Sequence, residues 1–183
     1  YHTSRGEKDM SVIGSSDLDD YTVQTRLKFD YWEEKFWAKS LGKYLYSYNK
    51  EEAGVMFRVK DSSNYYMFGL NGGKQAKDSN YEDKTNQAYL KVAVDGNIKT
   101  IATVNLEDIN LTTGEWYDVK IAVVGDKFKF YLNNQLVMEA SDSTHLRGKV
   151  GLVSIGTNAT FDDVSVDIVR NERKIIKEYD QDN

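Results

Sequence analysis

The sequence predicts an all-β protein, an antiparallel sandwich of two β-sheets, and two observations support this fold class. Apolar residues recur at every second position along most of the chain, and short runs of turn-forming residues separate these alternating segments. Alternation over five or more residues is typical of a strand with one face in a core. The sequence indicates no convincing helix. About ten short strands with turns between them are typical of a β-sandwich.

The strands follow from this alternation, taken in chain order. Segment 21–29 (YTVQTRLKF) places its apolar residues at odd positions, and segments 117–123 (YDVKIAV) and 127–132 (KFKFYL) alternate in the same way. We expect one or two strands before residue 14 and further strands near 21–29, 53–60, 65–71, 88–95, 98–104, 116–124, 127–133, 135–140, 149–155 and 161–168.

Turn-forming residues lie between these segments. Gly125 and the pair Asn133-Asn134 separate alternating runs, and glycine and asparagine tolerate the positive φ that tight hairpins require. Segments 61–64 (DSSN) and 95–97 (DGN) have the same character. Because hairpins join consecutive strands, the sheets are expected to be antiparallel.

The chain has 183 residues, enough for one domain with a sizeable core. We expect a single sandwich domain over residues 1–168 and a charged tail or linker over 169–183. Two stretches interrupt the strand pattern. Residues 30–52 form an insertion dense in aromatic residues, and residues 72–87 form a polar loop around Tyr81.

Composition excludes several classes of function. The chain has no cysteine, and therefore no disulfide or thiolate metal site. Its 24 basic and 29 acidic residues give a formal charge of −5, which argues against a nucleic acid or an anionic membrane as partner. No apolar run approaches the roughly 20 residues of a membrane helix. The chain begins at Tyr1 without a basic and apolar leader, so we expect a mature or excised domain.

Three stretches resemble a known family. They are 53–68 (AGVMFRVKDSSNYYMF), then 114–133 (which contains GEWYDVKI and FKFYLN), and finally 148–166 (which contains GKVGL and FDDVSV). In this order they resemble the concanavalin A-like (laminin-G-like) jelly-roll modules of bacterial polysaccharide-degrading enzymes, over about residues 12–168. The resemblance implies a jelly-roll sandwich, a lectin-like carbohydrate-binding role and an extracellular or cell-surface location in a bacterium. It specifies no particular sugar, since such modules bind many sugars and some only separate domains.

The aromatic insertion is the first candidate sugar site. A sugar ring offers an apolar C–H face that stacks on tryptophan or tyrosine, and its hydroxyls bind planar polar side chains. The candidate stacking residues of the insertion and of the polar loop are Trp32, Trp37, Tyr44, Tyr46 and Tyr81. The alternative is a hydrophobic flap that folds over the edge of the sandwich.

The second candidate is the face of the predicted sheet that points away from the core. If Val55, Phe57 and Val59 face the core, the intervening residues face away from it, and the same parity applies to 65–71 and 88–94. The side chains expected to share this exposed face as binding residues are Arg58, Tyr65, Asn71, Tyr89 and Lys91. The alternative is an ordinary solvated face with cross-strand packing between tyrosine and basic side chains.

Catalysis is the less favoured interpretation. Glucanases of the resembled fold carry a Glu-x-Asp-x-x-Glu strand, and no such spacing occurs here. The adjacent carboxylates of Asp19-Asp20, Glu33-Glu34, Glu51-Glu52 and Asp162-Asp163 would point to opposite faces of a strand, as solvated pairs do. Two alternatives stay open: a distant carboxylate pair that meets in space, and a lyase set formed by Arg58, Tyr65, Tyr89 and Lys91.

Calcium is a further expectation. Related modules often hold a structural Ca²⁺ near the joined termini, and Glu7, Asp9, Asp162 and Asp163 are the candidate ligands here. Ca²⁺ prefers six to eight oxygen ligands.

The sequence therefore predicts a non-catalytic carbohydrate-binding module that holds an attached extracellular glycoside hydrolase or lyase at its polysaccharide. The alternatives are a catalytic hydrolase or lyase on the same fold, and a structural spacer or adhesion domain.

Overall fold

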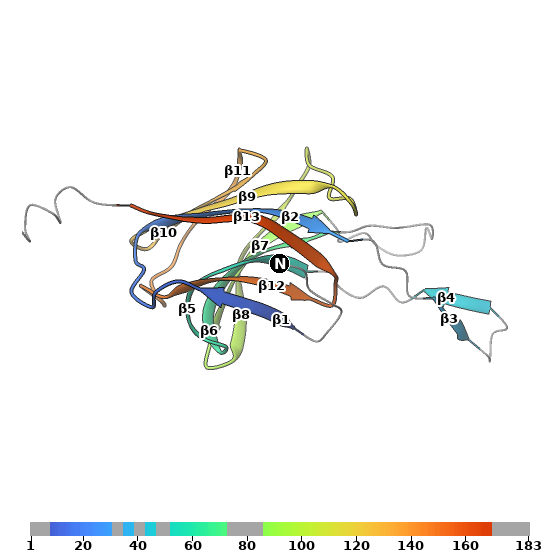
Figure 1. Cartoon of the computed structure of the whole chain (residues 1–183), viewed down its shortest axis with the longest axis horizontal. Coiled ribbons are helices and arrows are strands. Elements are labelled where there is room, and N and C mark those ends of the chain that lie inside the picture. Colours follow the sequence, from blue (N-terminus) through green and yellow to red (C-terminus); the bar gives the residue numbers. More distant parts are fainter. Residues whose placement is uncertain (1–7, 31–34, 39–42, 47–51, 73–85, 170–183) are drawn as a thin grey trace, which may run out of the picture.

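The computed structural model describes residues 8–30, 35–38, 43–46, 52–72 and 86–169, and the two short ranges are described by their backbone alone. Two antiparallel sheets pack face to face (Figure 1). None of the described residues forms a helix that is long and apolar enough to cross a membrane.

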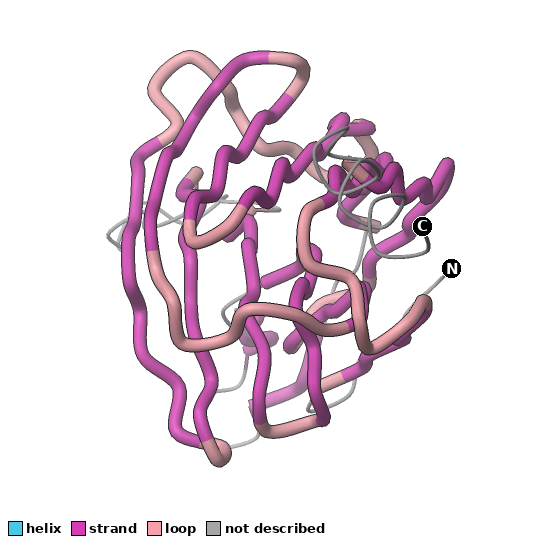
Figure 2. The backbone as a smooth tube through the Cα atoms, turned by 90° about the vertical axis from the view of Figure 1, so that its left-hand side faces the viewer, coloured by secondary structure: helices cyan, strands magenta, loops and turns pink. Residues whose placement is uncertain are grey.

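The larger sheet has six strands. Its spatial order is β1 (Asp9–Ile13), β12 (Lys149–Ile155), β5 (Glu52–Asp61), β6 (Asn64–Asn71), β7 (Gln87–Val94) and β8 (Asn97–Asn105). The second sheet has the order β11 (Gln135–Ser141), β10 (Lys127–Leu132), β9 (Trp116–Val124), β2 (Tyr21–Phe29) and β13 (Ala159–Ile168). The short strands β3 (Lys35–Ala38) and β4 (Lys43–Tyr46) pair only with each other. The tube view shows the long strands running side by side in each layer (Figure 2).

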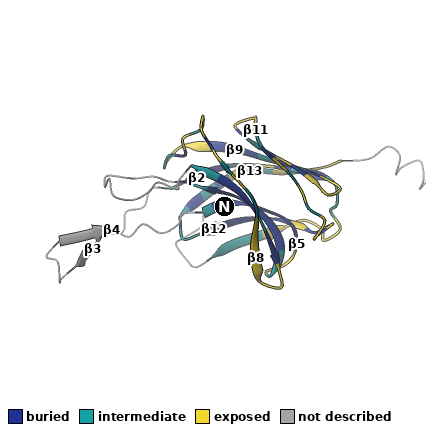
Figure 3. Ribbon diagram, turned by 180° about the vertical axis from the view of Figure 1, so that it is seen from behind, coloured by how far each residue is buried: buried dark blue, intermediate teal, exposed yellow. Residues whose placement is uncertain are grey.

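The main core lies between the two sheets and includes residues from the strands of both. Buried residues occur in the strands of both layers (Figure 3). Aromatic rings from both sheets interlock there. Phe68 of β6 stacks on Phe130 of β10 with ring centroids 4.5 Å apart, and Phe57 of β5 contacts Phe128 edge to face at 5.1 Å. Offset and edge-on geometries of this kind are favoured by aromatic quadrupoles. The core therefore consists of the alternating apolar positions that predicted the strands.

The predicted strands are confirmed with end shifts of up to two residues, and 21–29, 116–124 and 149–155 match their observed bounds. The predicted turns are also confirmed, because Asp95, Gly96, Gly125, Asn133 and Asn134 all have positive φ. No strand was expected within the insertion, and the structure shows β3 and β4 there, paired antiparallel.

Candidate functional site

The outer face of the six-stranded sheet, which points away from the main core, carries a second apolar cluster. Directly paired residues of neighbouring strands point to the same side, so the side chains form rows across the sheet. One row runs through Val153, Gly54, Gly69, Tyr89 and Thr103. The next row runs through Gly151, Met56, Met67, Lys91 and Thr100. The buried members of the cluster are Met56, Val59, Tyr65, Met67, Tyr89, Ala93 and Val153.

Two paired glycines form the floor of this face. A Cβ atom on Gly69 would lie 2.2 Å from Tyr89 Oη and 2.3 Å from its Cζ, so the phenol ring occupies the space above Gly69. A Cβ atom on Gly54 would lie 2.1 Å from the Phe68 carbonyl oxygen. Tyr89 therefore lies along the sheet instead of extending into solvent, and it is only 5% exposed. Glycine is needed at Gly69 because the ring fills the place of a side chain.

Lys91 and Glu52 form an ion pair next to this ring. Lys91 Nζ lies 2.8 Å from Glu52 Oε2 and 3.1 Å from Oε1, and it lies 4.2 Å from the centroid of the Tyr89 ring. Burial raises the pKa of the Tyr89 hydroxyl well above its usual value, and the Glu52 carboxylate raises it further. Among the described residues, the hydroxyl makes no well-formed hydrogen bond. Tyr89 is therefore a neutral phenol next to the Glu52 carboxylate.

A second tyrosine on the same face also lies beneath a lysine. Lys8 Nζ donates a hydrogen bond to Tyr65 Oη at 2.8 Å and lies 4.2 Å from the centroid of that ring. Tyr65 is 2% exposed. Both tyrosines thus combine a buried ring with a lysine ammonium, an arrangement that cation–π attraction stabilises.

A row of polar side chains borders the glycine floor at one end of the strands. Glu52, Asn71, Gln87 and Asn105 are paired in register across β5, β6, β7 and β8. Neighbouring strands are about 4.8 Å apart, so the row spans roughly 14 Å. Gln87 Nε2 donates to Asn105 Oδ1 at 2.8 Å. The row offers amide donors and acceptors and one carboxylate along a line perpendicular to the strands.

Four of the predicted sugar-binding residues lie on this face. The structure places Tyr65, Asn71, Tyr89 and Lys91 there, as the parity argument predicts. The expected exposure of the two tyrosines is wrong, because both rings are buried. Their contact with sugar stays a prediction.

The predicted position of Arg58 is wrong. The pairing of β5 with β6 shifts register between Phe57 and Asp61, and Arg58 itself has a φ of 50°. This bulge reverses the parity of β5, so Val59 packs on the outer face. The Arg58 side chain is 1% exposed and donates to the carbonyl oxygens of His145 at 2.9 Å, Asp19 at 3.1 Å and Gly125. It is a structural residue between the sheets and contributes neither to a sugar site nor to a lyase set on the outer face.

Other predicted binding residues cannot be compared in the same way. Trp32 and Tyr81 lie outside the described residues. Trp37 lies on β3, paired with Tyr44 of β4, and Tyr46 is paired with Lys35. Only the backbone is described for these strands.

Two of the three aspartates predicted to bind calcium, Asp162 and Asp163, contact an arginine, and calcium binding stays a prediction. Arg26 Nη2 lies 2.8 Å from Asp162 Oδ2, and Arg26 Nε lies 2.9 Å from Asp163 Oδ2. A hydrogen bond from the Asp163 backbone N–H and the contact with Arg26 lower the pKa of Asp162. Asp9 lies on β1, and Glu7 lies outside the described residues. The described residues contain no group of three or more His, Cys, Asp or Glu side chains that could hold a metal ion.

Sequence reasoning missed four residues of this face: Lys8, Glu52, Gln87 and Asn105. Glu52 was expected in a solvated pair with Glu51, yet its side chain is 13% exposed and binds Lys91. Gln87 and Asn105 lie one residue beyond the predicted ends of their strands. Extending the alternation of each predicted strand by one residue would have placed Glu52, Gln87 and Asn105 on the outer face.

Comparison with known proteins defines the class of protein. Residues 2–167 match the family described as the 3-keto-alpha-glucoside-1,2-lyase-like domain, and the chain belongs to this family. A search of curated proteins finds no match.

Solved structures share the fold. The carbohydrate-binding module CBM66 from Bacillus subtilis has a TM-score of 0.69 at 20% identity, covering 91% of this chain and 85% of that chain. A Bacillus subtilis protein with a galectin-like fold has a TM-score of 0.60 at 12% identity, covering 92% and 83%. Toad ovary galectin in complex with thio-digalactose has a TM-score of 0.58 at 11% identity, covering 90% and 100%. These similarities confirm the predicted jelly-roll β-sandwich.

Proposed function

We propose that the chain is a non-catalytic carbohydrate-binding module whose sugar site is the outer face of the six-stranded sheet. The observation that carries this proposal is the in-register row of Glu52, Asn71, Gln87 and Asn105 beside the glycine floor. Sugar hydroxyls both donate and accept hydrogen bonds, as carboxamides do, so a row of amides suits them. The spacing of about 4.8 Å between strands lets successive hydroxyls of one oligosaccharide reach successive strands.

The apolar part of the face would support the sugar ring. The Tyr89 ring lies along the sheet and the Lys91 ammonium lies over it. A sugar C–H face that displaced this ammonium would stack on the ring, while Lys91 and Glu52 would turn to its hydroxyls. The fold shared with CBM66 supports this proposal at the level of architecture.

The module would serve an attached catalytic domain in an extracellular bacterial protein. Holding that domain at its polysaccharide raises its effective concentration there, without any chemistry by the module itself.

Affinity electrophoresis through gels that contain different soluble polysaccharides tests the binding function. A binding module is retarded by at least one polysaccharide, whereas a spacer domain migrates unchanged. Gln87→Ala is expected to reduce the retardation. Gln24→Ala is the matched control, because Gln24 is an exposed amide on β2 of the other sheet. Equal retardation of the two variants would contradict the placement of the site.

A second candidate is the elimination that the family description names, and the Glu52–Lys91 pair favours it. In a 3-keto-glucoside the ketone acidifies the C2 proton. The Glu52 carboxylate would take that proton, the bond between C1 and the glycosidic oxygen would break, and the oxygen would take a proton from Lys91. The product would be an enone that absorbs in the ultraviolet. Formation of this product by the protein, and its loss in Glu52→Gln, would replace the binding proposal with a lyase; no product leaves binding as the function.

A further inference from the structure

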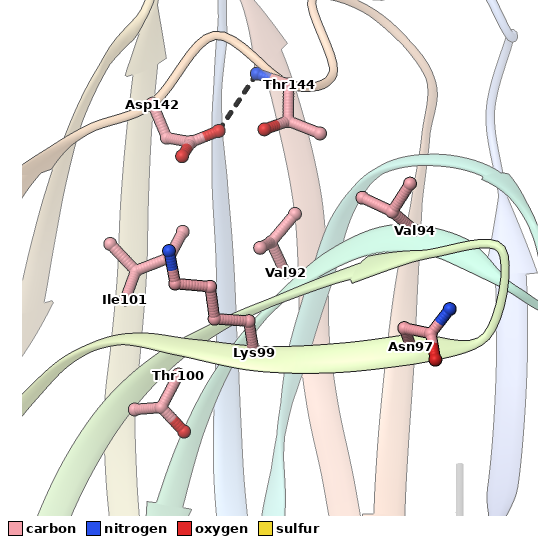
Figure 4. Close-up of a pocket in the computed structure, with 8 residues that line it drawn as sticks. All are labelled: Val92, Val94, Asn97, Lys99, Thr100, Ile101, Asp142 and Thr144. Carbon is pink, nitrogen blue, oxygen red and sulfur yellow. Dashed lines mark hydrogen bonds between the residues drawn. The ribbon is translucent and has the colours of Figure 1, made fainter.

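A pocket of about 390 Å³ opens between the two sheets, away from the outer face of the larger sheet. Its floor consists of three aliphatic side chains, Val92 and Val94 of β7 and Ile101 of β8. Lys99, Asp142 and Thr144 provide polar groups around it, and all face the same space (Figure 4). The volume and the combination of an apolar floor with a few polar groups are typical of small-molecule sites.

The edge strands explain why the sandwich is open here. β8 and β11 are the outermost strands of their sheets, and no backbone ladder joins them. The pairing of β7 with β8 shifts register between Leu90 and Lys91, so Ile101 is an additional residue that bends β8. Lys99 pairs with Val92, a core residue, and therefore lies on the inner side of β8, at the open edge of the sandwich, where its side chain is exposed.

The loop after β11 forms a fixed wall of the pocket. The backbone N–H of Thr144 donates to Asp142 Oδ1 at 2.9 Å, and the Tyr66 hydroxyl donates to the same oxygen. The next residue, His145, is buried, and its Nε2 lies 2.8 Å from the Ala93 carbonyl oxygen. These contacts tie the loop to β6 and β7, so the pocket exists before a ligand arrives.

The pocket carries one charge of each sign on opposite walls. Although burial opposes ionisation, hydrogen bonds from Thr144 and Tyr66 keep the pKa of Asp142 below its usual value, so its carboxylate is ionised at neutral pH. Figure 4 shows the Lys99 ammonium on the opposite wall, facing the same space. In the described part of the chain, Lys99 forms no ion pair within 4 Å. The lining has no net charge, which favours a ligand without net charge.

We propose that this pocket binds a single neutral sugar ring, at a second site that is independent of the outer face. One hydroxyl of the ring would donate to Asp142, and another would accept from the Lys99 ammonium. Its C–H face would lie on Val92, Val94 and Ile101. The proposal does not depend on the proposed function, since the two sites lie on opposite sides of the larger sheet.

Titration of the ¹⁵N-labelled chain with D-glucose, D-galactose, D-mannose or D-fructose tests this inference by NMR. We expect at least one sugar to produce saturable shifts in the amide signals of Val92–Ile101 and Asp142–Thr144, with a dissociation constant on the order of millimolar. Lys99→Met is expected to weaken this binding by roughly tenfold or more, because it removes a charged hydrogen-bond donor. Lys127→Met, which removes an exposed lysine of β10, is the matched control and leaves the titration unchanged.

Lys99→Met is expected to fold like the parent chain, because Lys99 is exposed and donates no hydrogen bond to described residues. Three results would overturn the proposal. The first is a linear, non-saturating response to all four sugars. The second is saturation by L-leucine but by no sugar, which would assign the opposed charges to a zwitterion. The third is self-association of Lys99→Met without any sugar response in the parent chain, which would show that Lys99 only protects the edge strand.

Discussion

Gly69→Ala is expected to destabilise the protein because the new methyl group would overlap the hydroxyl end of the Tyr89 side chain. The new Cβ atom would lie 2.2, 2.3 and 2.5 Å from Oη, Cζ and Cε2 of that ring, so the ring must move. Moving it also breaks the contact with Lys91 Nζ, 4.2 Å from the ring centroid. Overpacking of this kind costs about 1–3 kcal/mol, and alanine recovers roughly 0.5–1 kcal/mol over glycine within a strand. We therefore expect a net loss of up to about 2.5 kcal/mol in the free energy of unfolding.

The position of the ring can be tested by a double-mutant cycle. In a Tyr89→Ala background the obstacle is gone, and Gly69→Ala is expected to be neutral or slightly stabilising. In a Tyr89→Phe background most of the cost remains, because Cζ and Cε2 still lie 2.3 and 2.5 Å from the new methyl group. Urea unfolding of the single and double variants gives the coupling between the two sites.

A backbone clash provides the control. Gly54→Ala would place a Cβ atom 2.1 Å from the Phe68 carbonyl oxygen and 2.7 Å from Gly69 Cα, and neither can rotate away. We expect its cost to be the same with or without the Tyr89 ring. If Gly69→Ala also costs the same in the parent chain and in the Tyr89→Ala background, the ring does not lie over Gly69 and the description of the outer face is wrong.

Three further predictions concern other parts of the molecule. Arg58→Met is expected to lower the free energy of unfolding by about 2–4 kcal/mol, because buried carbonyl oxygens lose their donors, and to leave polysaccharide retardation unchanged; urea unfolding and affinity electrophoresis check this. Stability is expected to fall as the pH rises from 10 toward 12, because burial raises the pKa of Tyr21 to about 12, so the folded state resists losing this proton. Tyr21→Phe should reduce the slope of the urea midpoint against pH over this window, while Tyr66, whose pKa is also raised to about 12, still contributes; an unchanged slope would contradict the reasoning. We also propose that calcium stabilises the chain; identical melting curves in EDTA and in excess calcium would refute this.

Most strands could be predicted from the sequence because each one has a face in the core. The alternation in 21–29 and 116–124 is a direct consequence of burial on one side, as Val23 and Ile121 illustrate in their paired positions. The order of the strands in the sheets could not be predicted in the same way. The pairing of β1 with β12 joins segments that are far apart in sequence, and local alternation contains no information about such partners.

The candidate site could be predicted only where the strands are regular. Parity placed Tyr65 and Tyr89 on the correct face because β6 and β7 pair without a register shift. It failed on β5 because Arg58 adopts a positive φ, which is uncommon for a residue other than glycine or asparagine and leaves no sequence signal. Burial of the two tyrosines was also unpredictable, since it depends on Gly69 of the neighbouring strand under Tyr89 and on Lys8, which is 57 residues away from Tyr65 in the chain.

The way in which the outer face is covered argues for a ligand site. The main core already lies between the sheets, and stability alone would not require a second group of buried aromatic rings on the opposite side of the larger sheet. The groups above Tyr65 and Tyr89 are the ammonium groups of Lys8 and Lys91. A cation–π contact contributes only about 0.5–2 kcal/mol, and a lysine side chain can rotate away. A sugar ring that displaces Lys91 would therefore gain an aromatic surface at a small cost, and it would keep the displaced ammonium and Glu52 as hydrogen-bonding partners.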